Sequence, residues 1–195
     1  MSFNRRRKVY IISFASILLG IIVGFILSFT ISDVKSILSL SSKNYLSYLK
    51  GSADLNFIFL ENFRSIFLST IICSMLSIFV YTIPIGLLYI AYQSAVMIIS
   101  MSAISQTYGF VGVLNSMLII FPFNILIIVC LGLVIASVYS FTSLNIQSGY
   151  NLFAIREDRY IYYRLIILLL IEIFTCLILS YFVPFLFKSL IIVSF

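Results

Sequence analysis

The chain has 195 residues, of which 63% are hydrophobic and 9% are charged, and its formal net charge is +6. A typical soluble domain is about 25% charged, so this composition excludes an ordinary soluble fold. No charged residue lies between Arg64 and Arg156. An apolar run of that length holds several membrane crossings, since each takes about 20 residues. We therefore predict an all-α integral membrane protein: a bundle of about five transmembrane helices in the lipid bilayer, in a single domain over residues 1–195.

The first predicted crossing covers residues 9–31 and follows a basic cluster, Arg5 to Lys8. Positive residues beside a first span mark the cytoplasmic side, so this cluster sets orientation and is not a nucleic-acid patch. The apolar stretch is longer than the about 7–15 residues of a signal peptide, which favours an uncleaved anchor. Gly20 and Gly24 form a GxxxG pair, a pattern that lets another helix approach closely.

Residues 32–63 form the larger polar segment, which we expect on the outer side of the membrane. Apolar residues recur there at roughly helical spacing among Ser and Lys, and this pattern predicts an amphipathic surface helix. A second element, from Leu55 to Phe63, is rich in Phe. Two interpretations stay open: the segment covers lipid headgroups, or it docks an extracytoplasmic partner.

Two crossings are predicted next, at residues 65–81 and 84–104, because a single helix of that combined length would far outreach the bilayer. Pro84 supplies the break, since proline disfavours helix at the residue before it. The connecting turn is therefore very tight. Residues 105–109, with the sequence Ser-Gln-Thr-Tyr-Gly, form a short polar exit loop.

A fourth crossing is predicted at residues 123–142, preceded by a broken element around Pro122. In one interpretation, residues 110–121 form a short helix that lies along the membrane or re-enters it, a course that requires shielding by protein or water. In the other, Pro122 kinks one tilted helix. Asn124 follows the break and could satisfy backbone groups that Pro122 leaves free.

The last crossing is predicted at residues 165–187, after a polar return loop at 143–163. Arg156 and Arg159 in this loop favour the cytoplasmic side. Five crossings then place the N-terminus in the cytoplasm and the C-terminus outside. Three lysines of the outward segment count against this orientation, but less heavily than the N-terminal cluster counts for it.

Residues for catalysis are scarce in this sequence. It has no His, which excludes Ser–His–Asp and Cys–His catalysis within the chain. No pair of its Cys has metal-ligand spacing, and no glycine-rich phosphate loop is present. We expect no enzymatic activity, no cofactor and no metal. Cys73, Cys130 and Cys176 lie in apolar runs, and we interpret them as small buried side chains.

One ionisable residue, Glu172, lies within a predicted span. An acid at the centre of a membrane helix costs at least about 2.5 kcal/mol, so it normally faces protein or water. Glu172 is either a structural acid, protonated or hydrogen-bonded inside the bundle, or a functional proton, ion or partner-helix site. A lone acid makes a poor proton relay, and this favours the structural interpretation.

Three segments carry a family pattern. Residues 112–128 run from a Gly through an apolar stretch to Pro122-Phe-Asn124 and further Ile and Leu. The sequence ENFR at residues 61–64 precedes a span, and Ile83-Pro84 opens the next one. Together these segments resemble the stage II sporulation protein M family. The chain departs from the pattern at residues 92–95, where Tyr-Gln-Ser-Ala stands in place of a glycine-bearing stretch, and close helix packing there is in question.

The resemblance implies a non-enzymatic scaffold in the bacterial cytoplasmic membrane, at the septum of endospore-forming cells. Such a scaffold would hold extracytoplasmic peptidoglycan-degrading partners, the peptidoglycan hydrolases of a sporulation complex, during engulfment of the forespore. The resemblance points to the outward segment and the broken element as partner-binding positions: Tyr45, Tyr48, Phe57, Phe59, Asn62, Pro122 and Asn124.

The alternative function is a small membrane transporter or permease subunit, because transport sites are built from broken helices and intramembrane acids. No internal repeat is evident in the sequence, which weighs against it. A water-filled cavity that reaches both Glu172 and Asn124 would favour transport. A solid bundle with an exposed outward groove would favour a scaffold.

Overall fold

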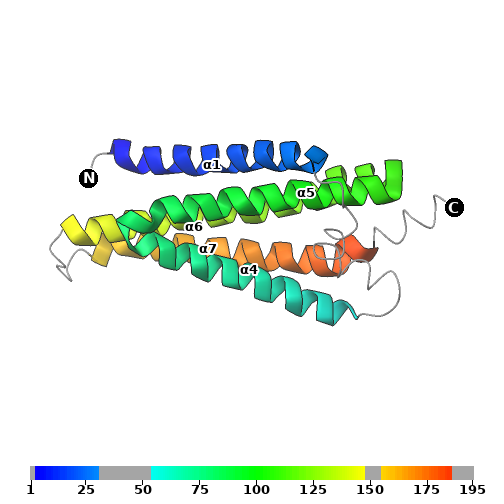
Figure 1. Ribbon diagram of the computed structural model, residues 1–195. Helices are drawn as coiled ribbons and strands as arrows, with labels where there is room; N and C mark the ends of the chain where they lie inside the picture. The colour runs from blue at the N-terminus through cyan, green and yellow to red at the C-terminus, as the bar shows by residue number, and fades with distance from the viewer. Residues whose placement is uncertain (1–2, 31–53, 148–154, 186–195) are drawn as a thin grey trace.

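The computed structural model of the chain describes residues 3–30, 54–147 and 155–185, and in these residues helices are joined by short turns. The main helices run side by side along one axis (Figure 1): α1 (Phe3–Thr30), α4 (Leu55–Ile78), α5 (Ile83–Asn115), α6 (Phe121–Gln147) and α7 (Ile155–Leu177). Five described stretches are long and apolar enough to cross a membrane: Lys8–Thr30, Leu55–Ile78, Ile83–Gln106, Phe121–Ser140 and Tyr162–Phe185. The predicted all-α membrane bundle is confirmed.

Many hydroxyl side chains within the spans donate a hydrogen bond to a carbonyl of their own helix. Ser94 donates to the carbonyl of Ile90 at 2.9 Å, and Ser137 donates to that of Leu133 at 2.7 Å. Such bonds to the carbonyl four residues earlier satisfy a polar group that would otherwise be unpaired. Serine is therefore compatible with a span that water does not reach.

Helix α1 packs closely on α5 through small residues. A Cβ atom added at Gly20 would lie 2.8 Å from Ala91 Cα, and one added at Gly24 would lie 2.8 Å from Ala95 Cα. The GxxxG pair therefore does bring a second helix close, as its spacing predicts. The sequence put close helix packing at residues 92–95 in question, but α1 does pack closely on α5 at Ala95. The glycines that permit the contact lie on α1, so α5 needs only alanines at the facing positions.

Helix α4 is continuous from Leu55 to Ile78, which corrects the division into a surface element at 55–63 and a span at 65–81. Glu61 and Arg64 lie within this helix and line a cleft between α4, α5 and α6, so the charges do not interrupt the helix. The rest of the predicted outward segment, residues 32–53 with Tyr45 and Tyr48, lies outside the described residues.

The connection between α4 and α5 is as tight as Pro84 predicts. It consists of Phe79 and a 3₁₀ turn, η1 (Val80–Thr82), and Pro84 lies in the first turn of α5. The Thr82 amide donates to the Phe79 carbonyl at 3.1 Å, and the Thr82 hydroxyl donates to the same carbonyl at 2.9 Å. From this turn the two helices diverge toward the other end of the bundle (Figure 1).

The break between the third and fourth crossings is at Gly109, not at Pro122. Residues 105–108 are helical rather than an exit loop, and the chain reverses at Gly109, whose φ of 59° and ψ of −136° suit only glycine. The returning segment packs against the helix it left: a Cβ at Gly112 would lie 3.1 Å from Ser105 Cα. After the reversal, residues 110–115 are helical and continue through a π-helical turn into α6, so the predicted helix over 110–121 does not end before Pro122.

Pro122 lies at the start of α6, directly after a π-helical turn, η2 (Ser116–Ile120). A π turn re-registers the backbone and commonly stands beside an irregular residue such as proline. Asn124 Nδ2 donates to the Ile120 carbonyl at 2.9 Å, so the amide does serve the backbone of this irregular turn. The fourth crossing is thus a helix with a wide turn at its start, closer to the kinked-helix interpretation than to the re-entrant one.

The final two helices extend further than predicted at their shared end. Helix α6 continues to Gln147 and α7 begins at Ile155, so the predicted return loop at 143–163 is partly helical. Helix α7 ends in a second π-helical turn, η4 (Ile178–Phe182). Arg164 donates to the Tyr10 hydroxyl at 2.6 Å and lies 5.1 Å from the centre of that ring, which links α7 to α1.

Helix α6 occupies the middle of the bundle, packed against α1, α4, α5 and α7. Ile135 and Leu131 of α6 are buried there with Ile90 of α5 and Ile17 of α1. The cysteines Cys73, Cys130 and Cys176 are free and buried, as predicted. A buried central helix and an apolar exterior, such as Phe25 at 59% exposed, are what a helix bundle in lipid requires.

Candidate functional site

A cleft of about 650 Å³ lies between α4, α5 and α6. It occupies the half of the bundle where α4 and α5 have diverged (Figure 1), and α6 forms its floor. Polar side chains from all three helices line it: Glu61, Asn62, Arg64, Ser65, Ser69, Gln93, Ser100 and Asn124. Pockets of this size hold small molecules when a few polar groups are placed among apolar ones.

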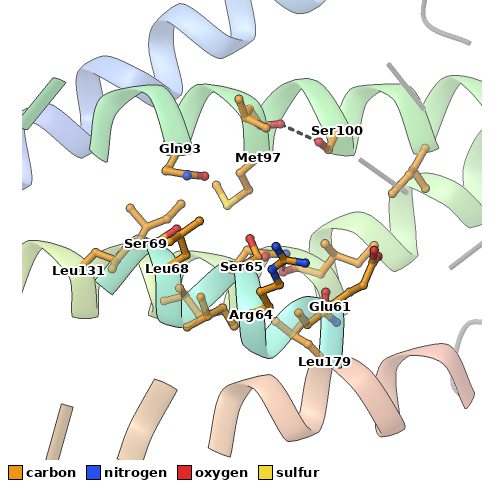
Figure 2. A pocket seen from close by; sticks show the side chains of 18 residues that line it. Glu61, Arg64, Ser65, Leu68, Ser69, Gln93, Met97, Ser100, Leu131 and Leu179 are labelled. Carbon is orange, nitrogen blue, oxygen red and sulfur yellow. Dashed lines mark hydrogen bonds between the residues drawn. The ribbon is translucent and has the colours of Figure 1, made fainter. Parts of the chain in front are cut away.

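The α4 wall of the cleft carries the charged groups. Five of the lining residues of α4 occupy positions i, i+3, i+4, i+7 and i+8, which share one face of a helix. They are Glu61, Arg64, Ser65, Leu68 and Ser69. In Figure 2 the side chains of Glu61 and Arg64 extend from α4 into the space toward α5. This wall therefore presents an anion and a cation one turn apart.

Three hydrogen-bonded side chains close the inner end of the cleft. Gln93 Nε2 donates to the Tyr89 hydroxyl at 2.8 Å, and that hydroxyl is 2.8 Å from Ser69 Oγ. The chain of bonds connects α5 to α4 at the depth where the two helices begin to separate. Met97 and Ser100 extend from α5 into the cleft beyond Gln93 (Figure 2).

The predicted partner-binding residues do not form one surface. Asn62 donates to Ser180 Oγ at 3.0 Å and also lines the cleft, while Phe59 stacks between Phe63 and Tyr181 with ring centres 5.8 Å apart. Phe57, at 53% exposed, faces away from the bundle. In the described residues, then, two of these side chains attach α4 to the end of α7, and Phe57 is available to a partner.

Pro122 and Asn124 are also separated in role. Asn124 lines the cleft, whereas Pro122 is exposed and is not among the lining residues. Pro122 therefore shapes the start of α6 without facing the cleft. The sequence pattern Pro-x-Asn brings the two residues to different sides of one helical turn.

Glu172 lies apart from the cleft, deep between α7 and α4. It is 2% exposed, and its Oε2 accepts a hydrogen bond of 2.7 Å from Thr70. Its other oxygen, Oε1, is buried with no hydrogen-bond partner in the described part of the chain. The cavity lining includes Asn124 and does not include Glu172.

Several contributors to this region carry no signal in the sequence. Thr70 is 102 residues from Glu172, and Ser180 is 118 residues from Asn62. The sequence around Tyr89 does not indicate that its hydroxyl forms hydrogen bonds with Ser69 and Gln93. Gln93 is the exception, because an amide within an apolar span indicates a hydrogen-bond partner; that partner, Tyr89, lies one turn away on the same helix.

Comparison of the chain with models of known protein families, with curated proteins and with solved structures finds no match.

Proposed function

We propose that this chain is a non-enzymatic membrane scaffold that anchors and positions peptidoglycan-degrading partners during engulfment in sporulation. The bundle would be the anchor, held in the septal membrane with the N-terminus in the cytoplasm. Support for the role comes from the three segments that resemble the stage II sporulation protein M family. The five-helix membrane architecture is compatible with it.

One observation carries the preference for a scaffold over a transporter: the cleft contains Asn124 but not Glu172. A transport path needs a cavity that connects its ionisable group with the broken helix, because the moving ion must pass both. Here Glu172 is bonded to Thr70 away from the cleft. The start of α4 instead presents exposed apolar side chains, which suit attachment of a partner.

The partner surface would lie at the start of α4, which is the outward end in the predicted orientation. Phe57 and Leu60 are 53% and 63% exposed there. Exposed aromatic and aliphatic side chains near a polar rim are the usual anchors of a protein interface. A hydrolase held at this end would be on the side of the membrane where peptidoglycan lies.

The experiment is affinity purification of the tagged full chain from sporulating cells in mild detergent, with mass spectrometry of the proteins recovered. We expect peptidoglycan hydrolases to be recovered, and Phe57→Ala to lower their yield about tenfold, the effect of losing one aromatic anchor. Phe14→Ala is the matched control, since Phe14 is 58% exposed on α1 at the opposite end of the bundle.

A small transporter or permease subunit is the second candidate, because amide and charged groups line the cleft. Recovery of an ATPase or another transport component in place of hydrolases would favour it and would reject the scaffold. Equal hydrolase yields from Phe57→Ala and Phe14→Ala would move the partner surface away from the start of α4.

A further inference from the structure

The cleft contains two opposite charges on a helix that is long and apolar enough to span a membrane. Glu61 and Arg64 are six and nine residues beyond Leu55, so they lie about 9 Å and 13 Å along α4 from its start. Both extend into the cleft (Figure 2). Ionisable residues on a membrane-spanning helix are costly unless they face water, protein or a polar ligand, and they are therefore candidate functional sites.

The cleft is elongated along α5. Its lining on that helix runs from Gln93 to Ile104, a distance of about 16 Å. The cleft holds about 650 Å³, a size that suits a small ligand such as a lipid headgroup with part of an acyl chain.

The order of side chains along the cleft matches the order of groups in a phospholipid. Arg64 offers a guanidinium, which binds phosphate through paired charge-assisted hydrogen bonds, and Glu61 offers a carboxylate to an ammonium. Ser65 provides a hydroxyl suited to an ester group, whereas the Ser100 hydroxyl donates to the Val96 carbonyl at 2.8 Å. Met97 and Leu131 then supply apolar contacts deeper in the span.

We propose that this cleft is a binding site for one phospholipid with a zwitterionic head and a primary ammonium, of the phosphatidylethanolamine type. The phosphate lies on Arg64, the ammonium lies beside Glu61, and an acyl chain extends over α6 toward Leu131. Basic pockets between transmembrane helices are known to recognise lipid headgroups. The acid beside the base selects a zwitterion over an anionic lipid, whose head has no cation for Glu61. The site is independent of the proposed scaffold role.

The test uses the full chain purified in mild detergent, incubated with equal amounts of phosphatidylethanolamine, phosphatidylcholine and phosphatidylglycerol, with retained lipid measured by native mass spectrometry. We expect the wild-type chain to retain phosphatidylethanolamine about tenfold over the other two, because of these three lipids only phosphatidylethanolamine has an ammonium with N–H groups to donate to Glu61. The N-monomethyl and N,N-dimethyl lipids should fall between, in order of their remaining N–H donors. These comparisons need no variant, so they hold even if a substitution impairs folding.

Three variants locate the site. Glu61→Gln should remove the preference for phosphatidylethanolamine over phosphatidylcholine, and Arg64→Gln should lower retention of all three lipids about tenfold. Lys8→Gln is the control, since it removes a positive charge near the start of α1, away from the cleft. Equal retention of the three lipids by the wild-type chain, or a preference for phosphatidylglycerol, would overturn the proposal. So would an Arg64→Gln variant that binds like Lys8→Gln.

Discussion

The contact of α1 with α5 can be tested by adding one small side chain at Gly20. An added Cβ would lie 2.8 Å from Ala91 Cα, whereas carbon atoms in favourable contact are about 3.5–4.0 Å apart. Gly20→Val would therefore push the helices apart by about 1 Å before its methyl groups are placed. A gap of that size already forfeits a quarter to a half of each van der Waals contact along the interface.

We expect Gly20→Val to lower the free energy of unfolding by about 1–3 kcal/mol, the usual cost of overpacking a close contact. The measurement is unfolding of the detergent-solubilised chain by increasing mole fractions of sodium dodecyl sulfate, followed by circular dichroism. Ala15→Val is the matched control, because Ala15 lies on the same helix and is exposed. If the two variants unfold at the same detergent composition, the close packing of α1 on α5 is refuted.

Two further stability predictions use the same unfolding assay. Thr70→Val should cost about 1–2 kcal/mol, because it leaves the buried Glu172 carboxyl without its hydrogen bond; in a Glu172→Leu background the same change should cost less, and strictly additive effects would contradict the contact. Gly109→Ala should cost about 1–3 kcal/mol, because its positive φ is strained for any residue with a Cβ. Gly132→Ala is its control, with an added Cβ no nearer than 3.6 Å to another side chain, and equal stability of the two alanine variants would exclude strain at the reversal.

The membrane architecture follows from composition because lipid imposes a single requirement on long apolar stretches, that their backbone be helical. Hydropathy therefore predicts five crossings, and the described residues contain five helices long and apolar enough to make them. The continuity of α4 could not be predicted in the same way. In sequence, Arg64 resembles a residue at the bilayer edge that separates an element at 55–63 from a span, whereas the helix runs through it from Leu55 to Ile78.

The position of the break before α6 was mispredicted for a different reason. Proline restricts the backbone wherever it occurs, so the break between the third and fourth crossings was predicted at Pro122. The reversal uses Gly109, whose left-handed conformation depends on the packing of the returning chain and not on its neighbours in sequence. A π turn then accommodates Pro122 with little change of direction. Pro122 follows an irregular π-helical turn, whereas the chain reverses its direction at Gly109.

Some residues of the candidate site can be predicted from the local sequence, whereas their partners on other helices cannot. Asn124 and Glu172 stand out locally, since an amide or an acid in an apolar span needs a partner. Their partners differ in kind: Asn124 bonds to a carbonyl four residues away, whereas Glu172 bonds to a threonine on another helix. Only the first can be inferred from spacing. The cleft itself arises from the divergence of α4 and α5, a property that no single segment encodes.

The partnership of α1 with α5 also sets an order of events during synthesis. Gly20 is made 71 residues before Ala91, the residue whose Cα its own helix approaches. At about 5–20 residues per second, that interval is about 4–14 s. Throughout it the glycine face of α1 has no α5 to pack against, and α4 is made in the meantime. The first helix to be inserted is thus among the later ones to be fixed in place, and any chaperone of membrane insertion would find its groove open for that time.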